Sequence, residues 1–145
     1  MTAHSFTLRV YYEDTDSLGI VYYANYLKFA ERARTEMLRH LGIEQEKLRA
    51  ETGLMFVVRR LAAEFLQSAR LDDELTVATR LRRLGGASLE LDQEVSRSER
   101  PLVRLALAIA CLGRDGRPAR LPPDLKSAFA PLGEGSDRKR NHGRL

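Results

Sequence analysis

The sequence is poor in the residues that build disulfides, metal sites and membrane spans. Its 145 residues include one cysteine, Cys111, and three histidines, His4, His40 and His142. A single cysteine excludes an intrachain disulfide, and the scattered histidines lack metal-ligand spacing, so no metal is expected. No apolar run approaches the roughly 20 residues of a membrane-spanning helix, and the N-terminus lacks the features of a secretory signal. We expect a cytoplasmic protein with no integral membrane segment, in which Cys111 packs in the core.

Aromatic residues and one-sided charge are also scarce. Aromatics make up 7% of the chain, and 24 Lys and Arg against 20 Asp and Glu leave a net charge of +4. The arginines are interspersed with acids and form no basic stripe, so nucleic acid is not an expected partner. Hydrophobic residues reach 43%, which is enough for one core. We expect one domain over residues 1–133 and a basic, disordered tail over 134–145.

Apolar periodicity predicts one long helix. From Tyr26 to Leu41, apolar residues recur at three- and four-residue spacing, and the helix opens near residues 23–25. A short strand over 6–12 precedes this helix. A short helical piece over 43–50 follows it and is closed at Gly53.

Four later segments have the pattern of strands. They are 54–66, which includes a bulge or bend, 75–82, 88–95 and 102–112. The middle two form a hairpin around Gly85-Gly86.

The last strand segment is alanine-rich enough to be a helix, but its large residues alternate with Ala106, Ala108 and Ala110. We therefore expect a strand whose alanine face lets a helix lie close against the sheet. A short helix follows over 122–129. The order of elements predicts an α+β fold, with an antiparallel β-sheet wrapped around one long central α-helix.

An acidic loop precedes the long helix. Glu13, Asp14 and Asp16 lie between the first strand and a bend at Gly19. The first turn of a helix leaves backbone N–H groups without partners and carries a partial positive charge, so a carboxylate here lies beside free donors. The alternative is that Asp14 or Asp16 only caps the helix or holds the loop backbone.

Several segments together resemble the hot-dog-fold acyl-CoA thioesterases, in the branch of 4-hydroxybenzoyl-CoA thioesterase and the Tol-Pal-associated enzymes. The resemblance covers residues 6–129 and is carried by Asp14-Thr-Asp16, Gly19-Ile-Val-Tyr, Asn25-Tyr26, the helix from Glu31 to Arg39, Phe56-Val-Val-Arg59 and Ala69-Arg-Leu-Asp-Asp73. It implies a dimer with a continuous sheet, and commonly a homotetramer made of two dimers.

The resemblance implies an enzyme that hydrolyses a coenzyme A thioester to the free acid and coenzyme A. No cofactor is implied, because coenzyme A is part of the substrate, and an acyl-carrier-protein thioester is an alternative substrate. Asp16 matches the catalytic aspartate of the family, as nucleophile or general base. The backbone N–H of Tyr23 matches the group that polarises the thioester carbonyl.

Two sub-branches leave different signals in the chain. Tol-Pal-associated enzymes usually have histidine where this chain has Tyr23, and tyrosine there resembles the 4-hydroxybenzoyl type. The long helix and the second-strand region, with Phe56-Val-Val-Arg59 and Ala69-Arg-Leu-Asp-Asp73, resemble the Tol-Pal type. The acyl group therefore stays open between short-chain, long-chain and aromatic groups.

Further residues are candidates for substrate contacts. They are Gly19, Val21, Tyr22, Asn25, Glu64, Ser88, Arg82 and Arg83. Arg82 and Arg83 match the chemistry of the coenzyme A phosphates, with a solvated strand edge as the alternative. The alternatives are a plain turn hydroxyl for Ser88 and an ion pair with an arginine for Glu64.

Two other functions are compatible with such a fold. A hot-dog dehydratase or hydratase uses a histidine base on or near the central helix, whereas His40 lies at the wrong end of it. A non-catalytic acyl-thioester binding or scaffold protein of the cell envelope does not need the intact Asp16.

Overall fold

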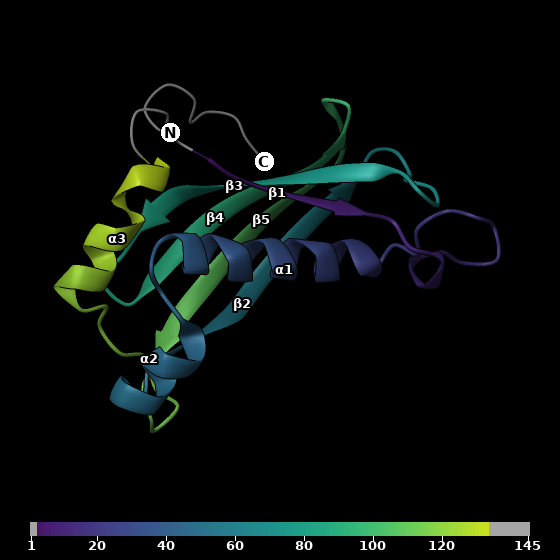
Figure 1. Ribbon diagram of the computed structural model, residues 1–145. Coiled ribbons are helices and arrows are strands. Elements are labelled where there is room, and N and C mark those ends of the chain that lie inside the picture. Colours follow the sequence, from purple (N-terminus) through teal and green to yellow (C-terminus); the bar gives the residue numbers. More distant parts are fainter. Residues whose placement is uncertain (1–2, 134–145) are drawn as a thin grey trace.

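The computed structural model describes residues 3–133, which form a five-stranded antiparallel sheet with one long helix across it (Figure 1). The elements in chain order are β1 (His4–Arg9), a 3-10 turn (Tyr12–Asp14), α1 (Asn25–His40), α2 (Gln45–Thr52), β2 (Met55–Phe65), β3 (Glu74–Leu84), β4 (Ser88–Arg97), β5 (Arg100–Leu112) and α3 (Pro123–Gly133). The strand order is β1-β3-β4-β5-β2, so β1 and β2 are the edges of the sheet. The predicted α+β class, with a sheet around a long helix, is confirmed.

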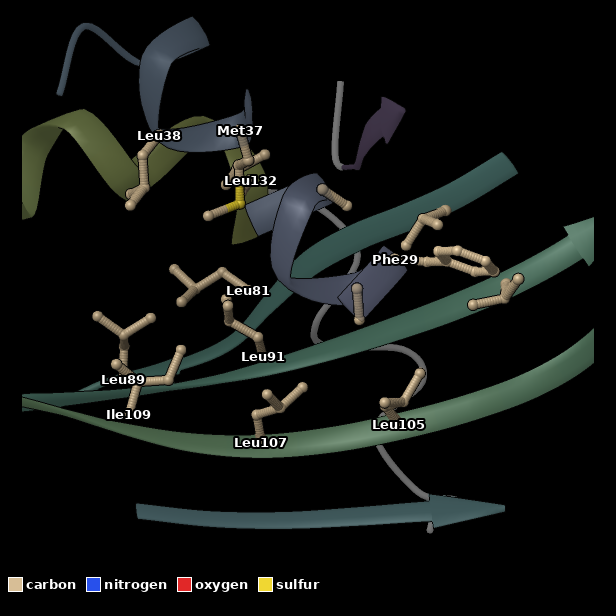
Figure 2. Close-up of a cluster of buried hydrophobic side chains, with 14 of the residues drawn as sticks. Phe29, Met37, Leu38, Leu81, Leu89, Leu91, Leu105, Leu107, Ile109 and Leu132 are labelled. Carbon is tan, nitrogen blue, oxygen red and sulfur yellow. The ribbon is translucent and has the colours of Figure 1, made fainter. Parts of the chain in front are cut away.

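The long helix packs against the sheet through a stripe of apolar residues. Phe29, Ala30, Ala33 and Met37 of α1 are each at most 1% exposed. Figure 2 shows Phe29 and Met37 directed at large side chains of the sheet strands, among which Leu91, Leu105 and Leu107 are labelled. Burying one such side chain contributes about 1.5–3 kcal/mol, so this layer holds α1 in place.

The face of β5 that receives the helix differs from the prediction. The large residues Leu105 and Leu107 face α1, whereas Ala106 and Ala108 on the opposite face are half-buried. The expectation that a helix would lie on the alanine face is therefore wrong. The small residues at the contact are on the helix instead, where Ala30 and Ala33 allow close packing on the leucines.

Most element ends lie within two residues of the predicted ones, and two differ by more. The first strand stops at Arg9 rather than continuing to Tyr12, because Asp14 accepts the N–H of Tyr11 at 2.8 Å and folds the chain into a 3-10 turn. The last helix continues to Gly133 rather than ending at 129. The bulge in the long strand β2 is confirmed, as is the β3–β4 hairpin. The predicted tail over 134–145 lies outside the described residues.

A buried amide links the helix to the sheet. Gln93 on β4 is 2% exposed, and its Nε2 donates to the carbonyl of Ala30 at 3.0 Å and to Oγ1 of Thr79 at 2.9 Å. Its Oε1 accepts Nη1 of Arg34 at 3.1 Å. These bonds satisfy the buried polar atoms and fix the register of α1 on the sheet.

Candidate active site

Asp16 lies in a tight turn that leaves one carboxylate oxygen free. Its N–H donates to the carbonyl of Ile20 at 2.9 Å, and its carbonyl accepts the N–H of Gly19 at 3.0 Å. Oδ1 accepts the N–H of Leu18 at 2.8 Å, which orients the side chain. Oδ2 has no donor among residues 3–133. The turn needs Gly19, whose φ of 83° is costly for other residues.

Asp14 has a structural role in the same loop. It is 8% exposed, and its carboxylate accepts the N–H of Tyr11. Its carbonyl accepts the N–H of Tyr22 at 3.0 Å and Nδ2 of Asn25 at 2.9 Å. Asn25 is the first residue of α1, so its side chain ties the helix start to the acidic loop rather than pointing freely to a ligand.

The start of α1 presents an unused donor. Ala24 occupies the N-cap position, and no side chain caps the helix. Asn25 donates its N–H to the carbonyl of Tyr22 at 2.8 Å, whereas the N–H of Tyr23 has no acceptor among the residues that the structure describes. This donor lies at the positive end of the helix dipole, where it can stabilise an oxyanion.

Aromatic rings lie in contact at the start of this helix. The ring of Tyr23 is 60% exposed and meets Phe65 on β2 edge-on, at a centroid distance of 5.8 Å. The ring of Tyr22 lies 5.0 Å from that of Tyr23. Val21, in contrast, is buried at 3% exposure and belongs to the core. The helix start therefore faces the Phe65 end of β2 across an open aromatic surface.

The structure places Glu64 on the face of the sheet opposite α1. It stands opposite Arg104 in the β2–β5 register, while its neighbour Phe65 faces α1. In one chain, Glu64 therefore does not point to the same side as Asp16.

Arg82, Arg83 and Ser88 lie at the far end of the sheet. Nε of Arg82 is 3.3 Å from Oδ1 of Asp92, and Nη1 of Arg83 is 3.7 Å from Oε2 of Glu90. Arg82 is eight residues beyond Glu74, the residue that begins β3 near the Asp16 loop, or about 27 Å along the strand at roughly 3.4 Å per residue. Within one chain these residues are not brought to Asp16.

A pocket of about 170 Å³ lies under the second half of α1. Its apolar lining residues are Met37, Leu38, Phe56, Val58, Leu89, Leu91, Ile109 and Phe129, and its polar ones are Glu31, Arg34, Thr35 and Gln45. The residues of the Asp16 loop do not line it.

Sequence reasoning missed the residues that support the Asp16 loop. Ala69 accepts the N–H of Val21, and Arg97 at the end of β4 holds the turn that contains Ala69. The segment that contains Ala69 resembled the family, but no local pattern marked Arg97.

Comparison with known proteins identifies the family. The sequence profile of the thioesterase superfamily matches residues 18–104. The acyl-CoA thioesterase YbgC of Haemophilus influenzae is 44% identical over 130 residues, which cover 88% of this chain and 95% of that protein. The acyl-CoA thioester hydrolase YbgC of Escherichia coli O157:H7 is 41% identical over 130 residues, which cover 88% of this chain and 96% of that protein.

Solved structures show the same fold. A probable thioesterase from Bartonella henselae has a TM-score of 0.80 at 40% identity, over 83% of this chain and 100% of that chain. A 4-hydroxybenzoyl-CoA thioesterase complexed with 4-hydroxybenzoyl-CoA has a TM-score of 0.84 over 90% of this chain and 100% of that chain, and at 21% identity it shows the fold alone. The chain belongs to the thioesterase superfamily, and the hot-dog fold that its sequence predicts is confirmed.

The described residues contain neither a membrane-spanning helix nor a cluster of metal ligands. Over residues 3–133, no helix is long and apolar enough to span a membrane. In the same residues, no group of three His, Cys, Asp or Glu side chains is arranged to hold a metal ion.

Proposed function

We propose that this acyl-CoA thioesterase hydrolyses its substrate with the carboxylate of Asp16 and the backbone N–H of Tyr23. One observation carries the proposal: Oδ2 of Asp16 and the N–H of Tyr23 are both free among residues 3–133, in a loop and helix start tied together through Asp14. The N–H binds the thioester carbonyl oxygen and stabilises the negative charge that forms on it during attack. Asp16 supplies the attacking group or activates it.

Two routes are compatible with this arrangement. In one, an Asp16 oxygen attacks the thioester carbon, the C–S bond breaks, coenzyme A leaves as a thiolate, and water hydrolyses the mixed anhydride. In the other, Asp16 removes a proton from a water molecule whose oxygen attacks the same carbon, and that proton passes to the sulfur as the C–S bond breaks. Both routes begin from ionised Asp16.

Asp16→Asn tests the proposal. The amide keeps an oxygen that can accept the N–H of Leu18, so we expect an unchanged fold and Tm. Thiol release from short-chain, long-chain and aromatic acyl-CoA should fall on the order of 10²- to 10⁴-fold.

Glu13→Gln is the matched control, because Glu13 is an exposed acid of the same loop. This variant should retain activity on every substrate that the unaltered protein hydrolyses. Near-normal turnover by folded Asp16→Asn would contradict the role given to Asp16.

We propose that two copies of the enzyme assemble through their β2 strands. This strand is an edge of the sheet, and its segment carries exposed apolar side chains, 36% to 47% accessible, at Met55, Val57, Val58, Leu61, Phe65 and Leu66. An edge with unpaired backbone groups and apolar side chains is a template for a second strand. Leu61 on β2 is 36% exposed, whereas Leu107, its partner on the neighbouring strand β5, is 1% exposed. The burial of the sheet therefore ends at β2.

Antiparallel pairing of two β2 strands would also complete the site. Because Phe65 contacts Tyr23, the Asp16 loop lies at the Phe65 end of β2. Ser88 and the 170 Å³ pocket lie toward the Met55 end. In an antiparallel pair, the Met55 end of the second copy lies beside the Phe65 end of the first. This brings the 170 Å³ pocket of one copy toward Asp16 of the other.

We assign the enzyme to the cytoplasm and regard a dimer of dimers as its full assembly. Light scattering of the full chain measures the assembly.

A further inference from the structure

The loop over residues 68–73 contacts both halves of the proposed site. Ala69 at its centre is fully buried. Its carbonyl accepts the N–H of Val21 at 2.9 Å, and its own N–H donates to the hydroxyl of Tyr26 at 2.9 Å. Val21 follows the Asp16 turn and Tyr26 lies in the first turn of α1, so one residue connects the acidic loop to the helix start.

The next residue extends this connection to Asp16 itself. Arg70 forms an antiparallel bridge with Ile20. The carbonyl of Ile20 accepts the N–H of Asp16 at 2.9 Å. A shift of the 68–73 loop would therefore move the Asp16 turn with it.

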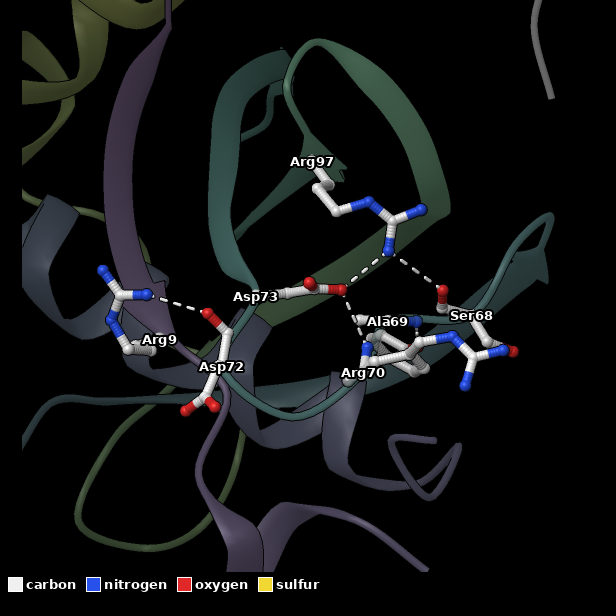
Figure 3. A network of polar contacts seen from close by, with 8 residues as sticks. Arg9, Ser68, Ala69, Arg70, Asp72, Asp73 and Arg97 are labelled. Atoms are coloured by element: carbon white, nitrogen blue, oxygen red, sulfur yellow. Dashed lines mark hydrogen bonds and ion pairs between the residues drawn. The ribbon is translucent and has the colours of Figure 1, made fainter. Parts of the chain in front are cut away.

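Arg97 clamps this loop from the end of β4, as Figure 3 shows. Its Nη1 lies 2.7 Å from Oδ2 of Asp73 and donates to the carbonyl of Ser68 at 3.2 Å. Oδ2 of Asp73 also accepts the N–H of Arg70 at 2.8 Å. One guanidinium therefore closes the two ends of the loop around Ala69 and Arg70.

The other side of the loop is held independently of Arg97. Asp72 adopts a left-handed φ of 73°, its N–H donates to the carbonyl of Val10 at 3.0 Å, and its carbonyl accepts Nη1 of Arg9 at 2.8 Å. Loss of the Arg97 clamp should therefore loosen the Ser68–Arg70 side of the loop without detaching it from β1.

We infer that Arg97 is a positioning residue for thioester hydrolysis, which holds Asp16 at its working distance from the N–H of Tyr23 by clamping Asp73 and Ser68. The inference rests on the roles proposed for Asp16 and Tyr23. Arg97 acts through the loop and contacts neither group directly. Since misplacement of a reacting group by about 1 Å can cost on the order of 10² in rate, a clamp of this kind affects turnover more than binding.

Arg97→Met removes the guanidinium while it keeps much of the aliphatic stem. We expect kcat to fall on the order of 10-fold or more and KM to change less than about 2-fold, because Arg97 does not touch the substrate. Amide hydrogen exchange should become faster in residues 14–23. Asp73→Asn weakens the same ion pair and should change both quantities in the same direction.

Arg104→Met is the matched control. Arg104 lies on the neighbouring strand β5 and forms an ion pair of 3.1 Å with Glu94, and its side chain is 47% exposed against 30% for Arg97. Within the described residues, no hydrogen bond of Arg104 involves the 68–73 loop. We expect the kcat and the exchange of residues 14–23 to stay as in the unaltered protein.

The outcomes separate the positioning role from the proposed function. If Asp16→Asn is inactive but Arg97→Met keeps its kcat, or loses kcat without faster exchange in residues 14–23, the positioning role is overturned. An equal loss in Arg104→Met overturns it as well. If Arg97→Met does not fold, Asp73→Asn decides by the same two measurements. Full activity of Asp16→Asn removes the proposed function whatever Arg97→Met shows.

Discussion

The rings of His4 and His40 lie close together at the opposite end of α1 from Asp16. Their ring centroids are 5.4 Å apart, and Nδ1 of His4 is buried without a hydrogen-bond partner among the described residues. Burial and then the charge of His40 lower the pKa of His4, although Glu36 opposes the shift. Stability from such a histidine is complete above the unfolded pKa of about 6.5, and it decreases as the pH falls from that value through the lowered folded pKa.

We expect the Tm of the unaltered protein to decrease between about pH 7.5 and about pH 5.5, because the unfolded chain binds the His4 proton more readily than the folded one. The His4→Phe variant has no group that takes up a proton at this position, so its Tm should decrease less over the same pH range. Thermal unfolding of both proteins at the two pH values measures the difference. An equal decrease in both would show that His4 does not couple folding to pH.

Single site residues could be predicted only where the signal is local in sequence. Asp16, Gly19 and the Tyr23 N–H fall within eight residues, so a short motif indicates them and the bend that joins them. The role of Arg97 depends on the strand order that brings the end of β4 beside Asp73, 24 residues away in sequence. A pattern of nearby residues carries no information about such a contact.

Among whole elements, the ends of α1 and α2 illustrate how a left-handed residue stops a helix. Gly42 follows α1 with a φ of 86°, and Gly53 follows α2 with a φ of 80°. An added Cβ at Gly42 would meet nothing within 4 Å, whereas at Gly53 it would overlap the side chain of Arg114. The two positions therefore share the backbone cost and differ in the space around them.

We expect Gly42→Ala to lower the free energy of unfolding by about 1–2 kcal/mol, the usual cost of a left-handed residue with a Cβ. Gly53→Ala should lower it further, because Arg114 must also move. Urea unfolding measures both changes. In the background of Arg114→Ala the extra cost of Gly53→Ala should disappear, and its persistence would place the strain elsewhere.

The strands of the sheet could be predicted because alternation is strong when one face is buried. Leu75, Val77, Thr79 and Leu81 on β3 are all buried, as their alternation indicates. The face of β5 that receives α1 could not be predicted in the same way, because both of its faces are apolar. The fit of small helix residues against large leucines decides it, and that fit exists only in three dimensions.

At the scale of the whole molecule, the open β2 edge predicts that activity depends on assembly. Leu61→Lys places a charge in the middle of the exposed apolar strip that we assign to the second copy. Burying an unpaired ammonium is costly, so light scattering should show a shift toward single chains, with thiol release recovering as the protein concentration rises. Leu71→Lys puts the same charge on a leucine outside β2 that is 42% exposed, and it should leave the assembly mass unchanged. A folded Leu61→Lys with the mass and activity of the unaltered protein would remove β2 as the assembly surface.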